Sequence, residues 1–220
     1  MTEAYNSDCM AAMAQMKDNE FDLAIVDPPY GIGYSEIKHP DRPTRKWNNP
    51  NSQVYKDFND NTQPTAKYFE ELFRISKNQI IWGANNFDNI PKSGGWVVWN
   101  KMVDEKERLS MAELAWTSFS KKIMLFNYLW AGFKKAKQVK RIHPTQKPVA
   151  LYKWLLKNYA KEGDRILDTH LGSGSSRIAA HDMGFDFVGY EIDKDYFDAQ
   201  EKRFANHIKQ GNLFDPKDMY

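Results

Sequence analysis

At 220 residues, 41% of them hydrophobic, and with a formal net charge of +2, the chain can bury one substantial core and is short for two, so we expect a single domain over 1–220. No stretch approaches the roughly 20 apolar residues that span a bilayer, and the N-terminus is too polar for a secretory signal, which predicts a cytoplasmic protein without a membrane partner. The single cysteine, Cys9, excludes an internal disulfide framework and a multi-cysteine zinc site.

The first strongly apolar element is FDLAIVD, residues 21–27, a nearly continuous run that ends in an acid. Such a run is typical of a strand buried in a parallel sheet. It leads directly into Asp27-Pro28-Pro29-Tyr30. From 35 to 64 the chain loses apolar periodicity and gathers Asn, Asp, Pro, Lys and Arg, so we expect a long exposed loop inserted into the domain. Loops of that length tend to be functional lids or disordered.

The segments QIIWGAN (79–85), GGWVVWNK (94–101) and AELAWTSF (112–119) are typical of three further strands. Pro148 stands where a helix would begin, with apolar residues at helical spacing up to Tyr159. RILDT (165–169) indicates a strand, a short helix closed by Met183-Gly184 follows, and DFVGYEID (186–193) indicates the next strand, with Asp193 as the cap of a last helix. This alternation predicts an α/β fold with a parallel sheet covered by helices.

The turn that follows RILDT is rich in glycine and reads Asp168-Thr-His-Leu-Gly172-Ser-Gly174-Ser. A turn of this kind after a strand lets a cofactor approach the backbone, although a tight structural turn is the plain alternative. Glu191 lies about 20 residues further on, where a carboxylate can accept hydrogen bonds from a ribose. Arg177 stands in place of the third glycine of a dinucleotide fingerprint, which favours an adenosine-type cofactor without a pyrophosphate over NAD.

The tetrapeptide at 27–30 has chemistry of its own. An exocyclic amino group of a nucleobase is a poor nucleophile until acceptors hold its hydrogens, and Asp27 with a backbone carbonyl can do so. Consecutive prolines fix an extended backbone and remove two amide hydrogens, which leaves carbonyls to face a substrate. Tyr30 offers a face on which a base flipped out of the duplex can stack. The alternative is a structural Pro-Pro turn with a half-buried tyrosine.

Three segments together resemble the amino-directed DNA methyltransferases of the permuted β group, in which the catalytic tetrapeptide precedes the glycine-rich turn. They are Asp27 to Gly31, His143-Pro-Thr-Gln-Lys-Pro148, and Asp168 to Ser176 followed by Glu191. The resemblance covers most of the chain outside 35–64. It implies a class I methyltransferase (Rossmann-like) fold with a mostly parallel seven-stranded sheet and helices on both faces. It also implies S-adenosylmethionine as cofactor, S-adenosylhomocysteine as product and no metal.

The resemblance further implies that Asp27, Pro28, Pro29 and Tyr30 are catalytic. Glu191 would hold the ribose, Thr145 and Lys147 would approach the methionine end, and Asp8 resembles the acid that contacts the adenine, for which a helix N-cap is an equally good account. Thr169 and His170 replace the usual Pro-Phe, which affects cofactor affinity, and we interpret His170 as a packing substitution. The implied cofactor contacts are Asp8, Asp27, Pro28, Thr145, Lys147, Asp168, His170, Leu171, Gly172, Ser173, Gly174, Ser175 and Glu191.

Double-stranded DNA is the expected partner, although a charge of +2 supports it only weakly and basic runs are often solvated surface. A small target-recognition region is expected over 101–142, with Trp116 and Trp130, and the 35–64 loop is a second candidate. The small size of the 101–142 region predicts a short target site, or help from a second subunit in a homodimer. The basic residues expected to contact DNA are Arg42, Arg45, Lys46, Lys134, Lys135, Lys137, Lys140 and Arg141.

The function expected is site-specific methylation of adenine amino groups in DNA, after base flipping. Asp27 favours adenine, since many amino-directed cytosine enzymes carry Ser there, yet amino-directed cytosine methylation stays open. RNA or protein amide methylation, an inactive cofactor- or DNA-binding homologue and, remotely, hydride transfer are further alternatives. Cys9 lies between Asp8 and Met10 and so lacks the Pro-Cys context of covalent cytosine enzymes. Without a nuclease-like or helicase-like segment we expect a stand-alone methylase, whether paired with a restriction enzyme or carried by a phage.

Overall fold

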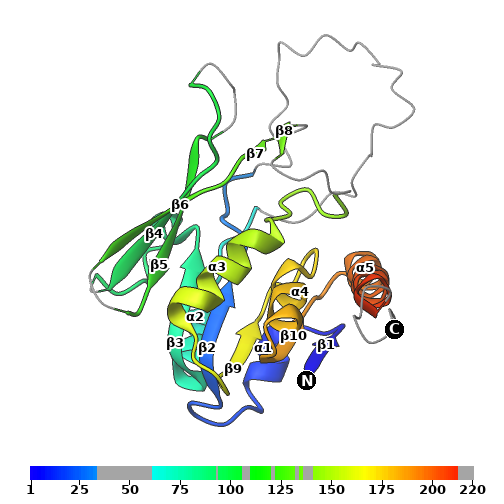
Figure 1. Cartoon of the computed structure of the whole chain (residues 1–220). Helices are drawn as coiled ribbons and strands as arrows, with labels where there is room; N and C mark the ends of the chain where they lie inside the picture. The colour runs from blue at the N-terminus through cyan, green and yellow to red at the C-terminus, as the bar shows by residue number, and fades with distance from the viewer. Residues whose placement is uncertain are drawn as a thin grey trace.

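A mixed β-sheet with helices on both faces forms the body of the protein (Figure 1). The computed structural model describes residues 1–33, 61–92, 94–105, 110–119, 122–131, 134–135 and 141–212. The loop prediction for 35–64 therefore lies outside the described residues except at 61–64. Within the described part, no helix combines the length and the apolar character needed to cross a membrane.

The strands of the main sheet follow one another in the order β1-β10-β9-β2-β3-β5-β4-β6. The first five are parallel, β5 is antiparallel to both of its neighbours, and β4 and β6 are parallel. Their bounds are Thr2–Tyr5 (β1), Phe21–Val26 (β2), Ser76–Trp82 (β3), Gly95–Asn100 (β4), Ala112–Thr117 (β5), Ile123–Asn127 (β6), Arg165–Asp168 (β9) and Asp186–Tyr190 (β10). A separate ribbon pairs Trp130–Ala131 (β7) with Lys134–Lys135 (β8).

The α/β architecture expected from the sequence, a mostly parallel sheet with helices on both faces, is confirmed, with one difference in the sheet. The described residues form eight strands in it, where seven were expected. The predicted strands at 21–27, 79–85, 94–101, 112–119, 165–169 and 186–193 all exist as β2, β3, β4, β5, β9 and β10. The two unpredicted members, β1 and β6, are the strands at the two edges of the sheet.

Helices lie on both faces of the sheet. Those predicted at Pro148, before Met183 and after Asp193 are all present, and the Asp193 carboxylate accepts hydrogen bonds from the amides of Asp195 and Tyr196 at 2.9 and 3.2 Å, as an N-cap does. The helices α1 and α2 are on one face, and α3 and α4 on the other, with α5 beside α4 (Figure 1). Their bounds are Cys9–Met13 (α1), Ala66–Ile75 (α2), Val149–Tyr159 (α3), Ser175–Asp182 (α4) and Lys194–Asn212 (α5), and Ala84–Asn86 forms a 3₁₀ turn, η2.

Strand β2 shows why its sequence is continuously apolar. Leu23 and Ile25 pack into the core under α3 and α4, whereas Ala24 and Val26 pack into the core under α1 and α2. All four are at most 1% exposed. Because both faces of the strand are covered from Leu23 to Val26, both faces carry apolar side chains there. The strand thus runs through the centre of the molecule and delivers Asp27 to the carboxyl edge of the sheet.

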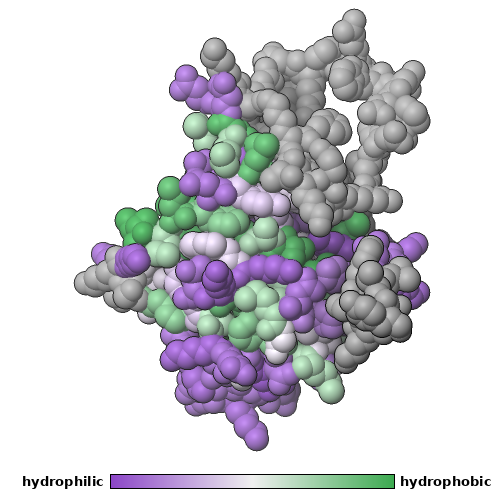
Figure 2. Space-filling view, viewed as in Figure 1, coloured by the Kyte–Doolittle hydropathy of each residue, from purple (hydrophilic) through white to green (hydrophobic). Residues whose placement is uncertain are grey.

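The opposite situation holds at the edge strand β6, where the space-filling view shows apolar surface (Figure 2). Ile123 is 68% exposed and Leu125 57% exposed, and the strand alternates exposed and half-buried side chains. An apolar edge strand on the surface is the exception in soluble proteins.

Candidate active site

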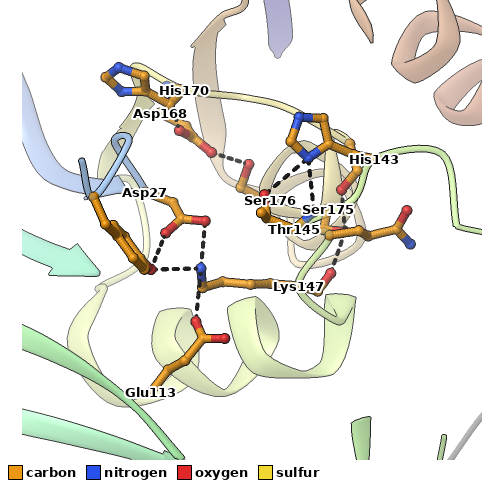
Figure 3. Close-up of polar contacts among 12 residues, drawn as sticks. Asp27, Glu113, His143, Thr145, Lys147, Asp168, His170, Ser175 and Ser176 are labelled. Carbon is orange, nitrogen blue, oxygen red and sulfur yellow. Dashed lines mark hydrogen bonds and ion pairs between the residues drawn. The ribbon is translucent and has the colours of Figure 1, made fainter. Parts of the chain in front are cut away.

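The tetrapeptide and the glycine-rich turn meet at one edge of the sheet. Asp27 directly follows β2, and Asp168 is the last residue of β9. These two strands are parallel neighbours, so their carboxyl ends lie side by side. In open α/β sheets this edge is where ligands bind. Residues 141 apart in the chain are thereby brought into one site, and Figure 3 shows Asp27 and Asp168 as neighbours in it.

Both carboxylate oxygens of Asp27 are engaged. The hydroxyl of Tyr30 donates to Oδ1 at 2.7 Å, and the ammonium of Lys147 forms an ion pair with Oδ2. Lys147 also donates to the Tyr30 hydroxyl at 3.2 Å, and its residue is 5% exposed. The structure therefore places Lys147 on the Asp27 carboxylate, a contact that the sequence did not indicate. Whether it also reaches a cofactor's methionine end stays a prediction.

Glu113 completes this cluster, and nothing in the sequence analysis singled it out. Its Oε2 lies 3.1 Å from Nζ of Lys147, and its Oε1 lies 2.6 Å from Nζ of Lys101. Strand β5 runs antiparallel to β3, so its first residues lie at the edge where β2 and β3 end. An acid at the start of an otherwise apolar strand was the available signal.

The charges in the cluster hold one another in place. Burial raises the pKa of Glu113, but attraction by Lys147 and Lys101 outweighs it and brings that pKa to about 2. Burial lowers the pKa of Lys147, but attraction by Asp27 and Glu113 outweighs it and raises that pKa above its ordinary value. Both groups are therefore charged at neutral pH.

Tyr30 is held from two sides. An added Cβ at Gly83 would lie 2.1 Å from the tyrosine ring, so this ring packs directly on the glycine backbone, which has a φ of +67°. Phe87 meets the ring edge-on, with centroids 6.2 Å apart. Burial, and then the charge of Asp27, raises the pKa of the Tyr30 hydroxyl well above 10, so this hydroxyl stays a hydrogen-bond donor.

The glycine-rich turn is fixed by two carboxylates. Asp168, 1% exposed, accepts from the Ser176 hydroxyl at 2.5 Å and from the His170 amide at 3.0 Å. Burial raises the pKa of Asp168 to about 7. Glu191 accepts from the Gly172 amide at 2.8 Å and from the Asp193 amide at 2.9 Å. Since a carboxylate oxygen has two lone pairs, each oxygen of Glu191 can still accept another bond.

The predicted His143–Pro148 segment packs on the same turn. The Ser175 hydroxyl donates to the Lys147 carbonyl at 2.8 Å, and the Thr145 hydroxyl lies 3.0 Å from Nδ1 of His143. Arg203 of α5 donates to the Ser173 carbonyl at 2.7 Å and to the Ser175 hydroxyl at 2.9 Å. Sequence reasoning did not find Arg203, because its position on a distant helix gives no local signal.

These residues fit an adenosine-type cofactor. Gly172 and Gly174 both have positive φ, and a Cβ at Gly174 would lie 2.9 Å from a side-chain oxygen of Gln200, so only glycine lets the turn pack this closely. Glu191 offers its carboxylate beside that turn, whereas Leu171 and Ser173 are buried at 4 and 5% exposure. Within the described ranges no group of three or more His, Cys, Asp or Glu side chains could hold a metal ion.

The remaining predicted site residues have mixed outcomes. Asp8 is the N-cap of α1 and accepts from the Met10 amide at 2.8 Å, so the capping account is confirmed and the adenine contact stays a prediction. The Arg141 guanidinium lies 5.5 Å from the Trp130 ring centroid. The structure describes Lys134 and Lys135 only as strand β8. The other basic residues predicted to contact DNA lie outside the described part of the chain: Arg42, Arg45, Lys46, Lys137 and Lys140.

His170 is part of a polar group that replaces the usual Pro-Phe. The Thr169 hydroxyl lies 2.7 Å from the Tyr68 hydroxyl and 2.9 Å from Nδ1 of His170, and the His170 ring meets the Tyr68 ring edge-on. Burial lowers the pKa of His170 to about 4. In Figure 3 its ring points away from Asp27, which supports packing rather than acid or base chemistry.

His170→Phe should make folding stability less dependent on pH. In the unfolded chain the imidazole of His170 is protonated below its ordinary pKa of 6.5, whereas in the folded protein it is protonated only below about pH 4. Between these two values protonation favours the unfolded state, so the free energy of unfolding falls as the pH drops. In the variant, the free energy of unfolding should fall less over this pH range, by the contribution of one proton. Urea unfolding at pH 7.5, about 5.5 and about 4.5 measures the difference. The difference at pH 7.5 gives the packing change alone. Equal slopes in both proteins would contradict the assignment.

Comparisons with known proteins agree with this geometry. Residues 98–202 match a family model described as DNA methylase, of the N6 and N4 type. The type II methyltransferase M2.DpnII of Streptococcus pneumoniae is 24% identical over 234 residues, which cover 90% of this chain and 87% of that protein. The fold resembles the crystal structure of the M1.HpyAVI–SAM complex, with a TM-score of 0.59 and 19% identity over 92% of this chain and all of that one.

A third similar protein is described as acting on cytosine. The structure of the PvuII DNA methyltransferase, described as cytosine-N4-specific, superimposes with a TM-score of 0.60 and 11% identity over 92% of this chain and 87% of that one. The fold is therefore also that of an enzyme described as cytosine-N4-specific. Its match over residues 98–202, its class I fold and its motif order are those of the S-adenosylmethionine-dependent DNA amino-methyltransferases, to which the chain is similar.

Proposed function

We propose that this protein methylates the exocyclic amino group of adenine within a specific sequence of double-stranded DNA, after flipping the target base out of the helix. The observation that carries the proposal is the placement of the Asp27 carboxylate at the end of β2, beside the glycine-rich turn that ends β9. That placement puts an acceptor for an amino group next to a turn suited to an adenosine-type cofactor.

The chain's own residues supply positioning. Asp27 would accept a hydrogen bond from the target amino group, and the carbonyl of Pro28 would accept a second. Holding both hydrogens makes the nitrogen lone pair available for attack. After the new bond from nitrogen to carbon has formed, the nitrogen would lose one proton to water. Gly172, Gly174 and Glu191 would hold the cofactor. When bound, S-adenosylmethionine supplies a methyl group already activated on a sulfonium, so orientation contributes most of the rate.

Tyr30 would receive the flipped base. One side of its ring packs on Gly83, and its hydroxyl is fixed by Asp27 and Lys147, so the ring is rigid before a substrate arrives. A rigid aromatic face stacks a base at a low cost in conformational entropy, and such stacking contributes on the order of 1–3 kcal/mol. This offsets part of the cost of taking the base out of the duplex.

Asp27 supports adenine over cytosine as the target, because many amino-directed cytosine enzymes carry Ser at that position. Amino-directed methylation of cytosine is the second candidate, since a cytosine-N4-specific enzyme shares the fold. The basic residues around the 35–64 loop and at 134–141 are proposed to hold the DNA backbone, as phosphate contacts supply most of the affinity of such proteins.

Methyl transfer from labelled S-adenosylmethionine to unmethylated DNA tests the proposal, with RNA and protein as control acceptors. Digestion of the DNA to nucleosides should then give N6-methyladenine, and sequencing should locate it in one short site. N4-methylcytosine would overturn the choice of base. Label in RNA or protein alone would overturn the substrate class. Cofactor binding without any transfer would identify an inactive homologue.

A further inference from the structure

The ammonium of Lys147 occupies a closed polar cage in the active site. Its nitrogen is ion-paired with Oδ2 of Asp27, donates to the Tyr30 hydroxyl at 3.2 Å and lies 3.1 Å from Oε2 of Glu113 (Figure 3). The ring centroids of Trp82 and Tyr30 lie 5.3 and 5.7 Å away, within the range of cation–π attraction. The side chain is 4% exposed, so water does not compete for these contacts.

This cage conflicts with the substrate contact required of Asp27. An ammonium is a nitrogen with hydrogens to donate, and so is the target amino group. Each oxygen of Asp27 already accepts one such bond, from Tyr30 and from Lys147, and its side chain is only 15% exposed, so few directions remain open to a further donor. Lys147 therefore occupies the position of an amino donor on the carboxylate, and a substrate amino group must compete with it there.

Glu113 is the one further carboxylate in contact with Lys147 among the described residues. Its Oε1 is fixed by Lys101 at 2.6 Å. Its Oε2 is buried and, in the part of the chain that the structure describes, accepts no hydrogen bond, although Nζ of Lys147 is only 3.1 Å away. A buried ammonium that loses a carboxylate partner is strongly destabilised, so Lys147 can leave Asp27 only where another anion receives it.

We propose that Glu113 is a positioning residue for methyl transfer: its Oε2 receives the hydrogen bond of Lys147 when the target amino group takes over Asp27. The ammonium turns between two carboxylates that it already touches, so no charge is created or lost in the cage. Lys147 thus occupies the position of the substrate amino group on Asp27, and Glu113 determines how easily the ammonium leaves that carboxylate. This inference rests on the proposed function of Asp27.

A double-mutant cycle tests it. Glu113→Gln should lower kcat/KM for target DNA about 10- to 100-fold, because a neutral amide holds the ammonium more weakly and leaves it on Asp27. Affinity for S-adenosylhomocysteine should not change. In a Lys147→Met background, Glu113→Gln should cost less than about threefold, since no ammonium remains to be received. Glu113→Asp should restore part of the activity. Glu162→Gln, in the exposed loop after α3, is the matched control.

Equal losses from Glu113→Gln in both backgrounds would overturn the inference, because a purely structural role does not depend on Lys147. Glu113→Gln within threefold of the unmodified protein would also overturn it. Should Lys147→Met give no measurable single turnover, the same comparison is made on affinity for the target duplex with S-adenosylhomocysteine bound, with the same decision. If the unmodified protein methylates no DNA, the proposed function itself is contradicted. The failure of the proposed function and the failure of the Glu113 inference are therefore distinguishable.

Discussion

Asp27→Ala is expected to abolish methyl transfer to DNA while cofactor binding remains measurable. The substitution removes the acceptor proposed for the target amino group, and a single preorganised hydrogen-bonding group of this kind contributes about 10²- to 10³-fold to the rate. Folding should survive, because Lys147 keeps Glu113 as a partner 3.1 Å away. Single-turnover transfer of labelled methyl measures the loss, and calorimetric titration with S-adenosylhomocysteine measures cofactor binding.

Two further variants separate the possible causes of such a loss. Asp27→Asn keeps the shape of the side chain and removes its charge, so it should be nearly as inactive as Asp27→Ala if the carboxylate itself is required. Asp198→Ala removes an exposed acid that pairs with Lys194 on α5 and should behave as the unmodified protein. Full activity in Asp27→Ala would refute the assignment of the catalytic group.

Gly83→Ala should produce the second large effect, although this glycine contacts no expected substrate. The new Cβ would lie 2.1 Å from the Tyr30 ring, so the ring must move and its 2.7 Å hydrogen bond to Asp27 must break. We expect transfer to fall about 100-fold or more, comparable to the loss of one active-site hydrogen-bonding group. Cofactor affinity should change little, because Gly83 lies at the end of β3 and not in the glycine-rich turn.

Gly163→Ala is the matched control for Gly83→Ala. Both glycines have positive φ, +67° and +85°, so both variants suffer the backbone strain of about 1–2 kcal/mol that a side chain meets there. At Gly163, however, an added Cβ has no atom of the described residues within 4 Å. A comparable loss of activity in both variants would show that strain, and not the position of Tyr30, causes the effect.

Prediction of the fold succeeded where strands are buried or bounded by glycine and proline. It failed for the two edge strands. β6 alternates exposed and half-buried residues and has no fully buried side chain, and β1 is only four residues long, Thr2–Tyr5, without a buried position. A strand at the edge of a sheet packs on fewer neighbours, so selection for apolar side chains is weaker and the pattern fades. The helix α2 begins just past the 35–64 insert and was likewise not predicted.

The sequence by itself determined the tetrapeptide after β2, the glycine-rich turn with Glu191, the segment from His143 to Pro148, and their order along the chain. These are local patterns, because residues that are neighbours in the chain are enough to indicate a strand or a turn. Only the tertiary structure decided that Lys147 pairs with Asp27, 120 positions earlier, that Glu113 closes the charged cage, and that Gly83 supports Tyr30. The physical reason is that these contacts form only when the sheet is assembled. Assembly buries the charged groups together and brings strand ends into contact, and the residues involved are far apart in the chain and share no local pattern.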